Sequence, residues 1–113
     1  MKFAHALRGL RVAMLEENSF TVHLPAALLG VAVGWWLEIS LAEWLALVIA
    51  ITIVLTAELL NTAIEHLARA VTRDDNPQVR NALDVAAAGV LAASIGAAVV
   101  GCLILAAHFV SRV

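Results

Sequence analysis

The chain has 113 residues, of which 63% are hydrophobic and only 14% are charged, and its net charge at pH 7 is −2. A soluble domain of this size is nearer half apolar and needs more charged side chains to cover its surface. The composition therefore favours a single integral membrane domain, residues 1–113, and the slightly negative charge gives no case for nucleic-acid binding.

Residues 1–18 predict an amphipathic helix. Apolar side chains recur there at helical spacing, whereas the basic residues fall largely on other faces. The apolar positions are Phe3, Leu7, Leu10 and Met14. A basic helix with one apolar stripe suits the membrane surface, so we expect it to lie in the interface.

Three long apolar segments follow, at residues 21–37, 41–60 and 85–107. A helix needs about 20 residues to cross the hydrocarbon core, and all three segments come close to that length. Three tryptophans, Trp35, Trp36 and Trp44, flank the junction between the first two segments, where an aromatic belt is expected. The expected fold is all-α, with a surface helix and three transmembrane helices.

The basic residues predict the orientation in the membrane. Six of the seven Lys and Arg residues lie within 2–11 or 69–80. The positive-inside rule then places the N-terminus and the loop region 66–81 in the cytoplasm and the C-terminus outside. Within the loop region we expect the second helix to continue to about Thr72. The third helix should begin at Pro77, with Asn76 as its N-cap.

Small residues form two stripes on the predicted spans. The first is the pair Gly30 and Gly34, and the second is Gly89, Ala93, Gly96 and Ala97. Such stripes let helices approach closely, and we interpret them as packing signals without catalytic weight. The one cysteine, Cys102, lies in an apolar run and is expected to pack as a small buried apolar side chain.

The polar residues Glu58, Asn61 and Glu65 are spaced by three and four, so they share one face of the second helix. A carboxylate at the edge of an apolar run is costly and needs a partner or a function. Such a face could hold Mg²⁺ through oxygen ligands or position a proton acceptor for a hydroxyl nucleophile. In the structural alternative, Glu65 pairs with Arg69 at i+4 and Asn61 joins two helices.

Two further acids are expected at the same depth, Glu17 before the first span and Asp84 at the start of the third. Alone, each is more simply a solvated charge or a helix-end acid, but four acids at one membrane edge favour a site. The histidines are scattered and suggest packing or interfacial positions rather than a metal cluster. They are His5, His23, His66 and His108.

The stretch from Glu58 to Glu65 resembles the signature E-x-x-N-[ST]-x-x-E of the prokaryotic diacylglycerol kinase and undecaprenol kinase family. Three more stretches are similar to family motifs in the same order along the chain. They are Arg8-Gly9-Leu10-Arg11 for [KR]-G-L-R, Glu17 through His23 for E-x-x-F-x-x-H, and Asp84 through Val90 for the part after Lys in K-D-x-x-A-x-x-V.

The resemblance implies a homotrimer in the bacterial cytoplasmic (inner) membrane that transfers the γ-phosphoryl group of Mg-ATP to a lipid hydroxyl, of diacylglycerol or undecaprenol, at the cytoplasmic face. It also implies roles for residues. The catalytic residues would be Glu58 as base, with Asn61 and Asp84 orienting the nucleotide and the loop. Glu17 and Glu65 would hold Mg²⁺. The residues expected to bind the cofactors are Arg8, Glu17, Glu65, Asp74 and, because of its i+4 position after Glu65, Arg69.

The sequence departs from the family where the nucleotide is handled. Leu83 stands where the family has a lysine that meets the ATP phosphates, and Arg69 stands where it has an acid. Three interpretations therefore stay open. The chain is a lipid kinase in which Arg69, Arg73 or Arg80 replaces the lysine, a metal-dependent phosphatase or transferase acting on lipid phosphates, or a non-catalytic member with a structural role.

Overall fold

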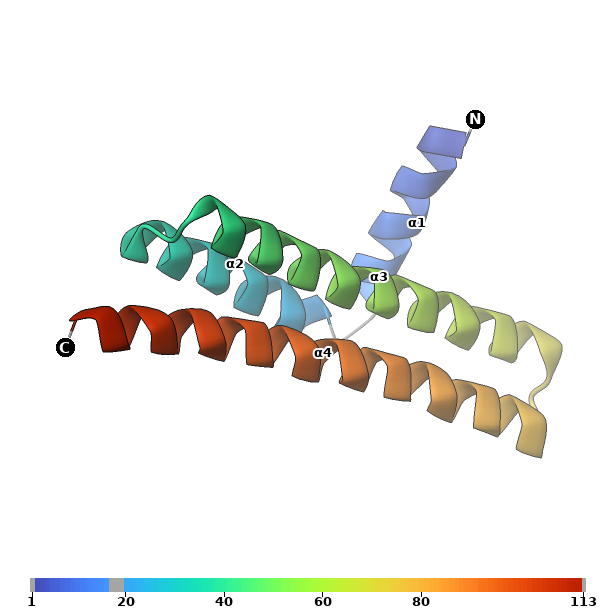
Figure 1. Cartoon of the computed structure of the whole chain (residues 1–113). Coiled ribbons are helices and arrows are strands. Elements are labelled where there is room, and N and C mark those ends of the chain that lie inside the picture. Colours follow the sequence, from blue (N-terminus) through green and yellow to red (C-terminus); the bar gives the residue numbers. More distant parts are fainter. Residues whose placement is uncertain (1, 17–19, 113) are drawn as a thin grey trace.

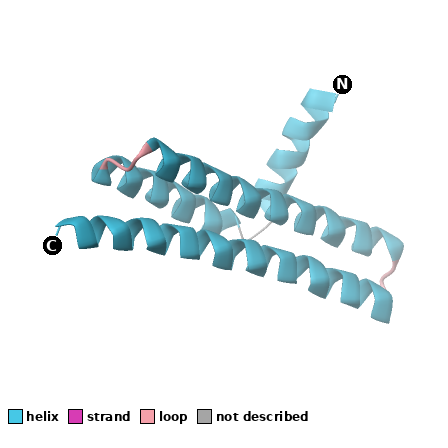
Figure 2. Cartoon of the chain, viewed as in Figure 1, coloured by secondary structure: helices cyan, strands magenta, loops and turns pink. Residues whose placement is uncertain are grey.

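The computed structural model describes residues 2–16 and 20–112, and these form four helices. They are α1 (Lys2–Glu16), α2 (Phe20–Leu37), α3 (Leu41–Val71) and α4 (Pro77–Arg112). Helices α3 and α4 form a long antiparallel hairpin, α2 lies along one half of it, and α1 projects away from the bundle (Figures 1 and 2). Helices α2, α3 and α4 are each long and apolar enough to cross a membrane, which confirms the predicted all-α membrane fold.

The predicted surface helix is helical over Lys2–Glu16, and the end of its predicted range lies outside the described residues. Its apolar stripe is open, with Phe3 78% and Leu7 54% exposed. Only near its end does it touch the bundle, where Ala13 is buried. This open stripe is the face that a helix lying on a membrane buries among the lipid headgroups.

A tight turn joins α2 to α3. The Glu38 N–H donates to the Trp35 carbonyl and the Ile39 N–H to the Gly34 carbonyl, both at 3.2 Å, while Glu38 has a φ of 54°. This pattern is the Schellman motif that ends many helices. A Cβ on Gly34 would lie 3.0 Å from the Ile39 side chain and 3.2 Å from that of Trp44. The second glycine of the G-x-x-x-G pair therefore permits the turn to fold back on α2.

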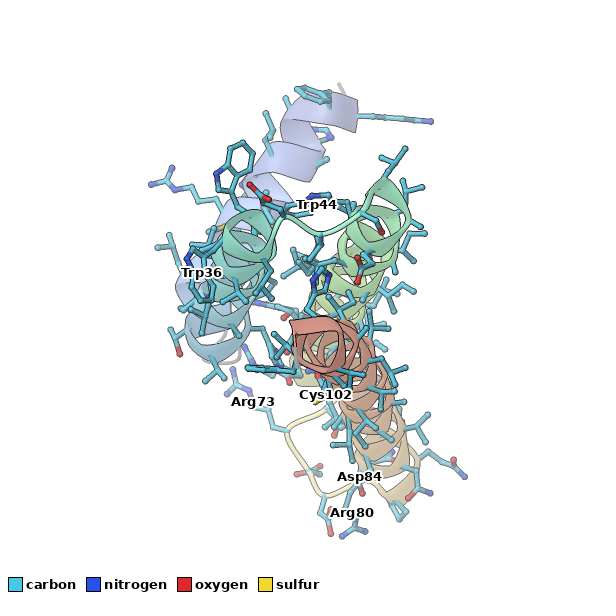
Figure 3. The ribbon with its side chains drawn as sticks, turned by 60° about the vertical axis from the view of Figure 1, so that its left-hand side comes forward. Trp36, Trp44, Arg73, Arg80, Asp84 and Cys102 are labelled. Atoms are coloured by element: carbon cyan, nitrogen blue, oxygen red, sulfur yellow. The ribbon has the colours of Figure 1, made fainter. Side chains whose placement is uncertain are left out.

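Ser40 caps the start of α3. Its hydroxyl accepts from the Glu43 N–H at 3.2 Å, and the Glu43 carboxylate accepts from the Ser40 N–H at 2.9 Å. This reciprocal capping box satisfies backbone donors that have no partner within the helix. Trp36 and Trp44 flank the turn, at the place predicted for an aromatic belt (Figure 3).

Helix α3 has 31 residues and is therefore about 46 Å long, longer than a hydrocarbon core of about 30 Å. It ends at Val71, and α4 begins at Pro77 after an irregular loop. The Asn76 side chain accepts from the backbone N–H groups of Gln78 at 2.9 Å and Val79 at 3.3 Å, which confirms the predicted N-cap. The predicted loop region 66–81 is thus mostly helical, with its irregular backbone limited to 72–76.

Helix α3 supplies most of the interior of the chain, whereas none of the apolar window of α4 is fully buried. A Cβ on Gly89 or Gly96 would meet nothing within 4 Å, so the two glycines of the second predicted small-residue stripe are open, whereas Ala97 lines a cleft shared with α2 and α3. Cys102 is exposed, so its predicted burial is wrong for the single chain. The reason is that α4 turns this face away from α2 and α3.

Candidate active site

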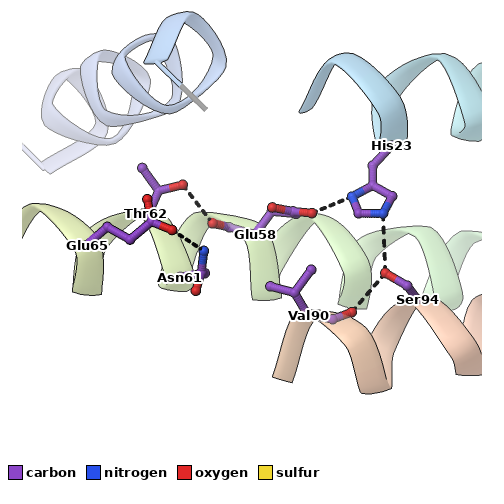
Figure 4. Close-up of polar contacts among 7 residues, drawn as sticks. All are labelled: His23, Glu58, Asn61, Thr62, Glu65, Val90 and Ser94. Carbon is purple, nitrogen blue, oxygen red and sulfur yellow. Dashed lines mark hydrogen bonds and ion pairs between the residues drawn. The ribbon is translucent and has the colours of Figure 1, made fainter. Parts of the chain in front are cut away.

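The polar face predicted on α3 is present (Figure 4). Glu58 is 0% exposed, Asn61 8% and Thr62 5%, and these side chains lie in an otherwise apolar part of the helix. The Glu65 side chain, two turns further on, is 31% exposed. The face therefore runs from the buried interior to the loop end of the hairpin, which is the end that carries residues 72–76.

Asn61 and Glu65 are hydrogen-bonded along the helix. The Asn61 amide donates to Glu65 Oε1 at 2.8 Å, and Arg69 Nη2 lies 3.7 Å from Glu65 Oε2. The i+4 pair of the structural alternative is therefore present, although 3.7 Å is long for a hydrogen bond and such pairs contribute only about 0.2–0.5 kcal/mol. The hydrogen bond from the Asn61 amide to Glu65 stays within α3 and does not join two helices.

Glu58 is paired with a histidine from another helix. Its Oε1 contacts His23 Nδ1 on α2, and His23 Nε2 lies 3.3 Å from Ser94 Oγ on α4 (Figure 4). The Ser94 hydroxyl also lies 2.8 Å from the Val90 carbonyl. Glu58 Oε2 is buried and has no hydrogen-bond partner among the residues that the structure describes. Three helices thus meet at this one carboxylate.

An apolar cleft of about 280 Å³ begins beside this cluster and lies between α2, α3 and α4. His23 and Ser94 are its polar lining residues, and the rest are aliphatic or glycine. A second apolar cleft of about 240 Å³ shares Gly30, Leu47 and Gly101 with it and reaches Leu37 at the far end of α2. The two together make an apolar path from the Glu58 cluster toward the α2–α3 turn.

A more polar cleft of about 510 Å³ lies at the loop end, between the end of α3 and the start of α4. It brings together three residues that the sequence predicted for cofactor binding, Glu65, Arg69 and Asp74. Arg80 also lines it, with Nη1 3.4 Å from Asp75 Oδ2. The remaining lining residues include Ala68, Thr72, Asn76, Val79 and Leu83. Leu83 therefore lies in the same cleft as two arginines.

Other predicted residues lie elsewhere. Asp84 is exposed near the loop end and is not among the residues that line the polar cleft (Figure 3). Arg8 is exposed on α1 and does not line it either. Glu17 lies outside the described residues, so its predicted meeting with Glu65 stays a prediction.

The described residues contain no group of three or more His, Cys, Asp or Glu side chains close enough to hold a metal ion. They do supply the Glu65 carboxylate, half-buried beside the polar cleft, which is a hard oxygen donor of the type that Mg²⁺ prefers. Mg²⁺ commonly keeps several waters and uses only one or two carboxylates. The Glu65 side chain therefore fits a site completed by one further acid.

Two histidines have contacts that the sequence analysis missed. Besides His23 on Glu58, His108 Nε2 lies 3.1 Å from both carboxylate oxygens of Glu43, near the α2–α3 turn. Each pair joins residues distant in sequence, so no local spacing reveals it. For the His23–Glu58 pair, a signal in the sequence is the depth of each residue along its predicted span. His23 lies at the start of the first span, and Glu58 lies near the same edge of the second.

The chain is similar to known proteins over most of its length. Residues 4–105 match the family described as "Prokaryotic diacylglycerol kinase". The chain is 34% identical to the undecaprenol kinase of Bacillus subtilis over 102 residues, which cover 90% of this chain and 83% of that protein. It is 30% identical to the diacylglycerol kinase of Escherichia coli K12 over 105 residues, which cover 93% and 86%.

Proposed function

Since the chain belongs to the prokaryotic diacylglycerol kinase family, a family of lipid kinases, we propose that it transfers the γ-phosphoryl group of Mg-ATP to a membrane lipid hydroxyl. The observation that carries this proposal is the position of Glu58. This fully buried carboxylate follows Val54 and Leu55, which line the apolar cleft, and precedes Glu65, which lines the polar cleft of the loop end. Glu58 lines neither cleft itself, so the proposal requires the lipid hydroxyl and the nucleotide to reach it from these two neighbouring parts of α3.

The apolar cleft suits the hydrocarbon part of the acceptor. Its lining from α3 includes Val54 and Leu55, which immediately precede the turn that carries Glu58. A chain lying in this cleft would bring the polar end of its lipid to the carboxylate. Diacylglycerol has two apolar chains and undecaprenol has one, and in both lipids the apolar part ends near a single hydroxyl.

The polar cleft suits the nucleotide. Guanidinium groups form strong charge-assisted hydrogen bonds with phosphates, and both Arg69 and Arg80 line this cleft. We propose that they replace the lysine whose position Leu83 occupies. Arg73 is exposed and is not among the lining residues, which disfavours it. Asp74 lines the cleft, whereas Asp84 and Arg8 enter the nucleotide proposal through the family resemblance.

In the proposed reaction, Glu58 Oε2 accepts the proton of the lipid hydroxyl as its oxygen attacks the γ-phosphorus. The bond between that phosphorus and the oxygen of ADP breaks, and its electron pair leaves with ADP. Asn61 holds Glu65 in place through their hydrogen bond. Glu17 and Glu65 would hold Mg²⁺, which when bound neutralises phosphate charge.

We further propose a homotrimer in the bacterial cytoplasmic membrane, with the loop end and N-terminus in the cytoplasm and the C-terminus outside. The open glycines in the small-residue stripe of α4 support self-association, because such stripes pack against neighbouring helices. A bifunctional amine reagent in native membranes should give a trimer, whereas a bifunctional thiol reagent on Cys102, the one cysteine of each subunit, should stop at a dimer. Recovery of monomer alone would contradict it.

The direct test incubates the purified protein in detergent micelles with γ-labelled ATP and both candidate lipids, with and without Mg²⁺. We expect label in one of the lipids, and only when Mg²⁺ is present. Release of phosphate from lipid phosphates without ATP would instead support a phosphatase or transferase. No turnover in any arm would support a non-catalytic role.

A further inference from the structure

The carboxylate that we propose as the base is held by a histidine and a serine from two other helices. His23 lies in the first turn of α2, Glu58 in the second half of α3, and Ser94 in the middle of α4 (Figure 4). The contacts run from Glu58 Oε1 to His23 Nδ1, and from His23 Nε2 to Ser94 Oγ at 3.3 Å. Each ring nitrogen therefore has one defined neighbour.

These neighbours fix one proton of the ring, on Nδ1, and are compatible with two charge states of the imidazole. An ionised carboxylate accepts hydrogen bonds only, so Nδ1 must carry a proton to bind Glu58 Oε1. If the imidazole is neutral, Nε2 is an acceptor and the Ser94 hydroxyl donates to it. If the imidazole is charged, Nε2 donates to Ser94 and the hydroxyl turns to the Val90 carbonyl, 2.8 Å away.

Ser94 thus accommodates both charge states by rotating one hydroxyl, with no movement of the ring. In both states Nδ1–H donates to the same oxygen of Glu58. Ser94 has a structural contact available in either case, because the Val90 carbonyl lies on its own helix. The donor and the acceptor that link His23 to Glu58 are therefore the same in both charge states of the histidine, although the charged imidazole binds the carboxylate more strongly.

We propose that His23 is a positioning residue for Glu58, and that it fixes Oε1 so that Oε2 faces the lipid hydroxyl. Both oxygens of Glu58 are buried without a hydrogen bond of good geometry among the described residues, and of the two only Oε1 has the close contact with His23 Nδ1. A glutamate has three rotatable side-chain bonds, so a single fixed oxygen removes much of its freedom. This inference rests on the proposed function, in which Glu58 is the base.

The surroundings of Glu58 agree with this role. The His23 imidazole on α2 contacts the Glu58 carboxylate, and the Ser94 hydroxyl on α4 contacts the other side of that imidazole. On its own helix, Glu65 is bonded to Asn61, and Thr62 Oγ1 donates to the backbone carbonyl of Glu58 at 2.9 Å. In the part of the chain that the structure describes, His23 is therefore the side chain that contacts the Glu58 carboxylate.

Two substitutions distinguish the positioning role of His23 from a purely structural role as a link between helices. In His23→Asn, the amide nitrogen stands where Nδ1 stands and still donates to Glu58. In His23→Leu, the donor is lost and the volume is largely kept. A positioning role predicts that the first variant is rescued and the second is not.

The experiment measures kcat and the KM for ATP of both variants in the lipid phosphorylation assay. We expect kcat of His23→Leu to fall about 100-fold, a typical loss for a misplaced catalytic group. That of His23→Asn should stay within about 10-fold of wild type, with the KM for ATP unchanged in both. Ser94→Ala, which keeps the donor to Glu58, should lose less than His23→Leu. Equal losses in the two His23 variants, or no loss in His23→Leu, would overturn the proposal.

The matched control is His108, whose imidazole also binds a glutamate but at the other end of the bundle. The same pair of substitutions there should leave kcat unchanged. A fall in kcat like that of His23→Leu would mean that loss of any helix link disables the enzyme, and would overturn the positioning role.

A second measurement separates this proposal from the proposed function. In protein labelled with ¹⁵N-histidine, the NMR signal of His23 should show a proton on Nδ1, and Glu58→Ala should remove its hydrogen bond. If that signal is present and wild type phosphorylates no lipid, the proposed function fails and the contact stands. If wild type phosphorylates lipid and His23 Nδ1 carries no proton, the positioning role fails alone.

Discussion

Two histidine–glutamate pairs connect the helices of this chain, one at the α2–α3 turn and one inside the bundle. In the first, His108 lies 3.1 Å from both oxygens of Glu43, which also accepts from the Ser40 N–H at 2.9 Å. In the second, Glu58 is 0% exposed, contacts His23 through Oε1 and leaves Oε2 without a partner among the described residues.

The two pairs differ in whether both carboxylate oxygens of the glutamate have a polar partner. Both oxygens of Glu43 have donors, and its capping box gives it a structural reason to be there. A buried polar atom without a hydrogen bond costs about 1–3 kcal/mol, so Glu58 is a costly residue for an apolar helix. The same pair of residue types thus links helices at the turn, whereas in the interior it leaves a carboxylate oxygen available for the proposed reaction.

The largest difference between the two pairs is expected when each glutamate is neutralised in turn. Glu58→Gln keeps the shape and removes the proton acceptor, so lipid phosphorylation should fall by about 10²–10⁴-fold, the usual contribution of a general base. Mg²⁺ binding should be retained. Glu43→Gln, measured in the same assay, should keep its activity. Comparable losses in the two variants would show that Glu58 has no special role.

The next effect concerns the metal. Glu65→Gln keeps the hydrogen bond from Asn61 possible and removes the charge that we expect to hold Mg²⁺. The Mg²⁺ concentration for half-maximal activity should rise about 10-fold or more, and Glu17→Gln should act in the same direction. A titration of activity against Mg²⁺ measures this. An unchanged titration in both variants would place the metal elsewhere.

A comparable effect is expected in the polar cleft. Removing a charged hydrogen bond to a phosphate typically costs about 1.5–3 kcal/mol, so Arg69→Ala or Arg80→Ala should raise the KM for ATP by about 10-fold or more. Arg73→Ala is the matched control and should have little effect. If neither arginine matters and Leu83→Lys lowers the KM, the chain tolerates the missing lysine instead of replacing it.

The smallest effect is expected at the outer pair. His108→Leu removes a link between α3 and α4 at the turn end, so the thermal midpoint in detergent should fall slightly while lipid phosphorylation is unchanged. Circular dichroism during heating, beside the activity assay, measures both. A large loss of lipid phosphorylation with an unchanged thermal midpoint would show that the His108–Glu43 pair has a function, and the two histidine–glutamate pairs would then not differ in role.

The order and limits of the helices could be predicted because they depend on local signals. Asn76 and Pro77 mark the start of α4, and the E-x-x-N-x-x-x-E spacing places Glu58 and Asn61 on one face. The His23–Glu58 pair could not be predicted this way, because it depends on how far α2 and α3 slide along each other. The expected burial of Cys102 failed because hydrophobicity alone does not say which neighbour covers a helix.

In the His23–Glu58 pair, the histidine precedes the glutamate along the chain, and this order matters while the protein is being inserted into the membrane. A ribosome delivers α2 to the membrane before α3, so His23 is already present when Glu58 leaves the aqueous pore of the insertion machinery. A charged residue disfavours the insertion of a membrane helix by up to about 2.5–3.5 kcal/mol at the helix centre, and by less near the edge, where Glu58 lies. Pairing within the nascent α2–α3 hairpin would reduce that barrier before α4 and Ser94 have been synthesised. The contact between His23 and Glu58 is therefore expected to matter during insertion as well as in the folded chain.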